Sequence, residues 1–69
     1  MHKEQAEQYS GRITEFQLEL DKLRSVLRQE NDDLSPTDRK RFAYVSALKA
    51  VDHANERLGE LLQTLREFV

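Results

Sequence analysis

The sequence predicts an all-α fold, an antiparallel hairpin of two long helices that resembles a short coiled coil. Apolar residues recur in alternating steps of three and four over both halves of the chain, and a polar segment with the only proline separates the halves. The hydrophobic fraction of 38% beside a charged fraction of 35% suits solvated helices better than a compact globule. We expect a single domain over residues 1–69, with a helix over about 5–30, a turn at 31–36 and a helix over about 36–68.

The first predicted helix is defined by one row of apolar residues. Its alternating steps place the side chains on one face of a helix. The row consists of Ala6, Tyr9, Ile13, Phe16, Leu20, Leu23 and Leu27. Glu30 falls on the same row and ends it, and the polar segment that follows favours a turn.

The second predicted helix has a clear start signal. Ser35 is a candidate N-cap, Pro36 suits the first helical position, and Asp38 supplies an acid in the first turn. The apolar row of this helix consists of Tyr44, Ala47, Val51, Ala54, Leu58, Leu61, Leu65 and Phe68. Because a short connection makes neighbouring helices antiparallel, we expect the two rows to face each other. The leucines at 58, 61 and 65 should then pack against the first half of the first helix.

The second helix carries more apolar surface than one row needs. The surplus predicts a partner-binding surface, which consists of Phe42, Val45, Leu48, Leu62 and Val69. A stripe of small side chains, Ala43, Ala47, Ala50 and Ala54, fits two interpretations: it seats the first helix, or it seats a helix from another protein. Since two helices bury only one interface, a partner is also expected on energetic grounds.

The residues needed for catalysis or metal binding are scarce. There is no cysteine, the two histidines are His2 and His53, and no glycine-rich phosphate loop is present. His53 lies near Asp52 and Glu56, but three such groups are typical of a hydrated helix face, because a closed metal site needs four ligands. We therefore expect no enzyme activity, no metal, no cofactor and no small-molecule substrate.

Net charge and hydropathy indicate which partners and which cellular location to expect. The net charge of −2 creates no strong field, and Arg39, Lys40 and Arg41 are flanked by aspartates, so nucleic acid is not an expected partner. No segment reaches the roughly 18 apolar residues of a membrane span, and the first residues lack the apolar core of a signal peptide. These features predict a cytoplasmic protein.

Residues 44–54 resemble the second helix of the small E-type co-chaperones of type III secretion needle subunits. The shared pattern is an aromatic residue five positions before a basic–Ala–aliphatic–acidic run, carried here by Tyr44, Lys49, Ala50, Val51 and Asp52. The resemblance spans about a third of the chain. It implies a helical hairpin that joins a larger helical chaperone and keeps a needle subunit soluble before export.

The sequence thus predicts a non-enzymatic protein–protein interaction module, and three alternatives stay open. Two copies could associate into a four-helix bundle and act as a small regulatory or adaptor protein. The hairpin could instead cover a surface of an enzyme or transcription factor. A nucleic-acid accessory role is the third.

Overall fold

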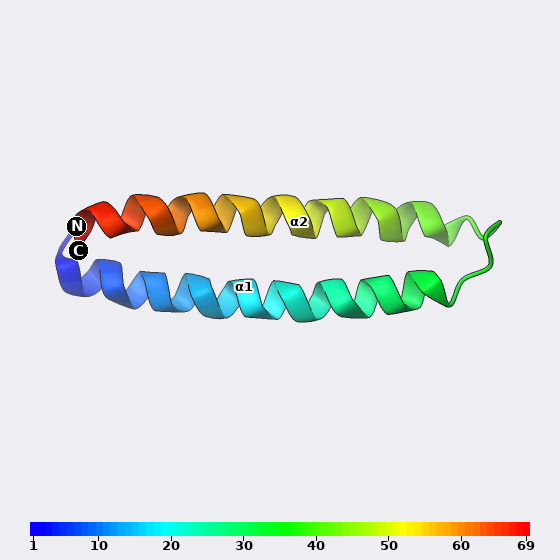
Figure 1. The fold of residues 1–69 in the computed structure, drawn as a ribbon, viewed down its shortest axis with the longest axis horizontal. Helices are drawn as coiled ribbons and strands as arrows, with labels where there is room; N and C mark the ends of the chain where they lie inside the picture. Colours follow the sequence, from blue (N-terminus) through cyan, green and yellow to red (C-terminus); the bar gives the residue numbers. More distant parts are fainter.

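The computed structural model describes residues 1–69 and is an antiparallel hairpin of two helices (Figure 1). Helix α1 covers Lys3–Asp32, helix α2 covers Lys40–Leu65, and a 3₁₀ turn, η1, continues α2 over Arg66–Phe68. Both chain ends lie at one end of a rod whose Cα atoms span 52 × 15 × 10 Å. The predicted all-α hairpin is confirmed.

The connection between the helices is longer than the sequence signal suggests. Helix α2 begins at Lys40 and not near Pro36, because residues Ser35–Asp38 close a turn of their own, with the Asp38 N–H donating to the Ser35 carbonyl oxygen at 3.0 Å. The N–H of Lys40 donates to the Asp38 carboxylate at 2.9 Å. Asp38, and not Ser35, therefore satisfies a backbone donor at the start of the helix.

Arg41 links this connection to the end of α1 through hydrogen bonds. Its guanidinium donates to the carbonyl oxygens of Leu34, at 3.2 Å, and Asn31, at 3.4 Å. The side chain is half-buried, unlike those of its neighbours Arg39 and Lys40. Carbonyl groups after a helix end need donors, so Arg41 serves the turn. One of the three basic residues of this segment is thus committed to the fold.

The two helices meet along a seam that is rotated from the predicted one. The predicted rows supply alternate positions to it, and the most buried are Ala6, Val51 and Leu65. Of the other predicted positions, Ala47 and Ala54 are half-buried and five large side chains are exposed: Tyr9 46%, Phe16 61%, Leu23 45%, Leu61 44% and Phe68 44%. Half-buried residues of the neighbouring rows take their places: Ser10, Gln17, Arg24, Asn31, Arg41, Leu48, Asn55 and Leu62.

The expected packing of the three leucines is only partly correct. Leu65 is buried, and Leu58 lines a hollow with Tyr9, Ile13 and Phe16 from the first half of α1. The expectation is wrong for Leu61, which is 44% exposed. The rotation of the seam explains the difference, since Leu61 lies three residues after Leu58 and therefore at one flank of the seam instead of at its centre.

The seam contains a layer of polar side chains. Gln17 donates to the backbone oxygen of Asn55 at 3.2 Å, and the Asn55 amide donates to the Asp21 carboxylate at 3.0 Å. Arg24 and Asp52 form an ion pair at 3.1 Å, with both side chains about half exposed. An exposed pair of this kind contributes about 0–1 kcal/mol. The layer fixes the alignment of the helices more than it stabilises them.

The hairpin has a very small core. Only 3 of its 69 residues are buried, and one of these is an alanine. Domains of this size need most of their apolar side chains in contact to balance the conformational entropy of folding. Most apolar side chains of the hairpin therefore stay partly or largely exposed to water, so they contribute little to its stability.

Candidate functional site

The unused apolar surface is concentrated on one side of the hairpin. On α1, Leu23 and Arg24 lie three and four residues after Leu20, so they flank it on opposite sides. On α2, Ala54 and Asn55 flank Val51 in the same way. The polar members of these pairs lie on one side, where Arg24 meets Asp52 and Asp21 meets Asn55. Their apolar counterparts must therefore lie together on the other side.

We call this other side the apolar face. It is made by two rows with a seven-residue spacing, one from each helix: Tyr9, Phe16 and Leu23 from α1, and Ala47, Ala54, Leu61 and Phe68 from α2. The five large side chains are 44–61% exposed, and the two alanines are half-buried. Aromatic and aliphatic side chains in a contiguous row are typical of interface centres.

The two rows lie on the same side for a second reason. Glu30 continues the α1 row by one more seven-residue step, and its carboxylate accepts a hydrogen bond from the Tyr44 hydroxyl at 2.7 Å. At the other end, Tyr9 and Phe16 line the hollow beside Leu58 of α2. Contacts between the helices at both ends of the α1 row thus fix the orientation of the face.

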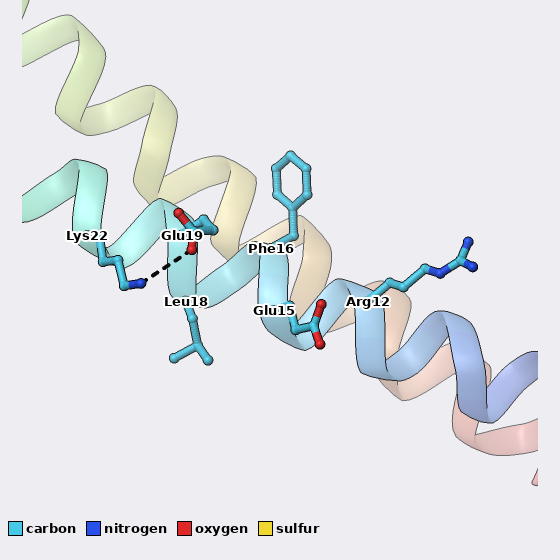
Figure 2. Close-up of a pocket in the computed structure, with 6 residues that line it drawn as sticks. All are labelled: Arg12, Glu15, Phe16, Leu18, Glu19 and Lys22. Carbon is cyan, nitrogen blue, oxygen red and sulfur yellow. Dashed lines mark hydrogen bonds and ion pairs between the residues drawn. The ribbon is translucent and has the colours of Figure 1, made fainter.

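The opposite surface of α1 is polar with a single apolar residue. Figure 2 shows Phe16 and Leu18 pointing in opposite directions from the helix, while Glu19 and Lys22 pair at 3.3 Å. Leu18 is 56% exposed and Phe16 is 61% exposed, and both border one open hollow on α1. They differ in direction, because Phe16 lies beside Leu58 of α2 and Leu18 lies on the side of Asn55. Leu18 therefore provides a natural control for experiments on Phe16.

The structure separates the five residues that the sequence grouped as a partner-binding surface. Phe42 and Val45 line a hollow beside the turn, formed with Pro36 and the residues after it. Leu48 and Leu62 are half-buried on the seam and are therefore only partly available to a partner. Val69, at the chain end, lines a hollow together with Leu62. Binding of a partner by these five residues stays a prediction.

Sequence reasoning found the residues of the apolar face but assigned them to the interior of the hairpin. The seven-residue spacing was the correct signal. The sequence did not reveal that the polar residues Ser10, Gln17 and Arg24 lie between the helices. A search for apolar patterns does not place polar residues there. The alanine stripe is also divided: Ala47 and Ala54 lie on the apolar face, half-buried, and Ala43 and Ala50 are exposed.

The acidic and histidine side chains form no cluster that could hold a metal ion. No group of three or more His, Cys, Asp or Glu side chains is placed to hold a metal ion, and no helix is both long and apolar enough to cross a membrane. The acid–base equilibrium of Tyr44 is clearly perturbed. Its hydrogen bond to Glu30 raises the pKa of the hydroxyl, with smaller contributions from desolvation and from the charges of Glu30 and Asp38.

This shift gives a testable pH dependence. A raised pKa in the folded state favours the protonated tyrosine, so its contribution to stability is present below the ordinary value of 10.0 and is lost as the pH rises through the folded pKa. In a Tyr9→Phe variant, ultraviolet titration should show Tyr44 ionising above 10.0. Glu30→Ala should lower that pKa. An unchanged titration would contradict the hydrogen bond.

Comparisons with protein-family models, with curated proteins and with solved structures find no match for this chain.

Proposed function

We propose that this chain is a non-enzymatic protein–protein interaction module that presents its apolar face to helices of another protein chain. One observation carries the proposal: the two rows of the apolar face point toward a common side, while only the alternate apolar positions of each helix meet in the seam. In a four-helix bundle each helix directs its apolar row to the bundle axis, so a hairpin from such a bundle has this geometry. The module contributes two helices and its partner contributes the rest.

The chemistry of the face supports a helical partner. Its residues form two parallel rows along a straight rod, which suits ridges of side chains from other helices. A helix that packs along the groove between the rows would contact Phe16 and Leu61 together. Apolar helices bind such grooves through residues spaced by three and four positions.

The resemblance of residues 44–54 suggests a class of partner. By this analogy the module is a cytoplasmic co-chaperone of type III secretion, which joins a larger helical chaperone and helps to cover the apolar helix of a needle subunit. Within the resembling segment, Val51 contributes to the seam. Ala50 lies at the edge of the apolar face. The analogy assigns no catalytic, metal or cofactor residue.

Site-specific photocrosslinking in the native host tests this function. A photoreactive phenylalanine analogue at Phe16 should crosslink to a helical protein, because it would lie at the centre of the complex. The same analogue at Leu18 should give no such product, since that side chain points away from the face (Figure 2). For the co-chaperone proposal, mass spectrometry should identify the captured protein as a helical chaperone.

The same experiment tests the surface that the sequence suggested. An analogue at Phe42, which is 81% exposed beside the turn, reports on that surface. Products from Phe42 or Leu18 with none from Phe16 would contradict docking through the apolar face. Products from Phe42 alone would restore the first assignment.

A further inference from the structure

We infer that the apolar face is occupied by a second copy of this chain, in a two-fold symmetric four-helix bundle whose turns lie at opposite ends. The inference rests on the proposed function, because it names the chain that covers the face. The arguments come from the size of the face, its self-complementarity and the distribution of large and small side chains along it.

The area of the face fits a stable dimer. The rod spans 52 Å by 15 Å between Cα atoms in the plane that contains both helices, so covering this face would bury on the order of 800 Å² on each copy. This is the usual size of a specific protein–protein interface. A second hairpin has the same length and the same two rows, so it can cover the whole face.

The side chains of the face are unevenly distributed along the rod. The half that contains the chain ends carries Tyr9, Phe16, Leu61 and Phe68. On α2, the row has Ala47 near the turn and Ala54 at the middle, and on α1 it has Leu23. The α2 row is therefore bulky near the chain ends and small near the turn.

This taper selects one of the two symmetric arrangements. If the turns lay at the same end, α1 of each copy would pack against α2 of the other. The large side chains near the chain ends would then crowd together, while Ala54 and Ala47 would lie over the region of Leu23 and Glu30. With the turns at opposite ends, α2 packs against α2 of the second copy and Leu61 lies over its Ala47. Alternation of large and small side chains across an interface gives close packing. The arrangement also gives Ala47 and Ala54 a role, since these small side chains leave room for the second copy.

The position of the symmetry axis follows from the helix bounds. Ala54 is at the midpoint of residues 40–68, the continuous helical segment of α2 and η1. In the arrangement with opposite turns, the two copies of Ala54 meet near the axis. In the other arrangement each Ala54 would instead lie over α1 of the second copy, near Leu23.

The first test is the oligomeric state of the purified protein. Sedimentation velocity at about 100 µM should show a dimer, and dilution should reveal a concentration-dependent helix signal. Phe16→Glu with Leu61→Glu should raise the dimer dissociation constant on the order of 100-fold or more, because four carboxylates would be desolvated at the interface. Leu18→Glu should leave the dimer unchanged. A monomer at this concentration, folded or unfolded, would overturn the inference.

The second test is the orientation of the two copies. The chain has no cysteine, so single cysteines can be introduced without background. Ala54→Cys should form an intermolecular disulfide under mild oxidation, since the two side chains meet at the axis. Spin labels on Thr37→Cys should lie at a separation near the 52 Å length of the rod. A separation below about 20 Å, as adjacent turns would give, would overturn the arrangement.

These results can be told apart from failure of the proposed function. If the pure protein is a monomer while Phe16 still crosslinks to a different helical protein in the host, the second copy is the wrong occupant and the interaction module stands. If Phe16 crosslinks only to the chain itself, the dimer is the functional partner. If the two glutamates leave association unchanged, and the analogue at Phe16 of the otherwise unaltered chain captures nothing, both proposals are wrong.

Discussion

Val51→Asp is expected to unfold the hairpin at 25 °C. Val51 is 6% exposed at the middle of α2 and lies between the helices. A carboxylate there would lose its hydration without a partner, since the nearest seam cation, Arg24, is already paired with Asp52 at 3.1 Å. A buried unpaired charge costs about 3–5 kcal/mol, which equals the whole stability that a core of this size supplies.

Circular dichroism measures this effect directly. The helix signal of the variant should be lost at neutral pH and partly regained as the pH falls and the new carboxyl group becomes protonated. His53→Asp is the matched control, because His53 is exposed two residues away and the same charge there stays hydrated. A fully helical Val51→Asp variant would show that the helices do not pack through this residue.

Asn55→Leu is expected to stabilise the protein. The side-chain oxygen of Asn55 is buried without a hydrogen-bond partner, although its amide donates to Asp21. Replacement by leucine removes the unsatisfied acceptor and adds apolar contact on the seam. The gain should be about 1–3 kcal/mol, which raises the melting temperature by roughly 5–20 °C in a domain of this size.

Asn55→Ala separates the two contributions to this gain. Alanine also removes the unsatisfied oxygen but adds little apolar surface, so its melting temperature should lie between those of the wild type and the leucine variant. Thermal unfolding of the three proteins at equal concentration gives the order. A leucine variant that melts below the wild type would mean that the polar layer is a net source of stability.

The sequence by itself determined the secondary structure and the topology of this protein. Alternating steps of three and four apolar residues are a local property of a helix, and they predicted both helices to within a few residues at most ends. The start of α2 was the exception. Ser35 and Pro36 carry a helix-start signal, but Asp38 captures the Lys40 N–H and Ser35 closes a separate turn. Two overlapping local signals competed, and the sequence does not rank them.

Only the tertiary structure decided which side of each helix faces the other. An apolar row identifies the side of a helix that avoids water, but it does not say whether that side meets the second helix or a different chain. The rotation of the seam places Gln17 and Asn55 between the helices and leaves Phe16 and Leu61 exposed. In a hairpin each helix is covered by a neighbour on one side only, whereas in a bundle each helix is covered on two sides. The surface available for function therefore depends on the packing angle of the pair, a property that no single helix possesses.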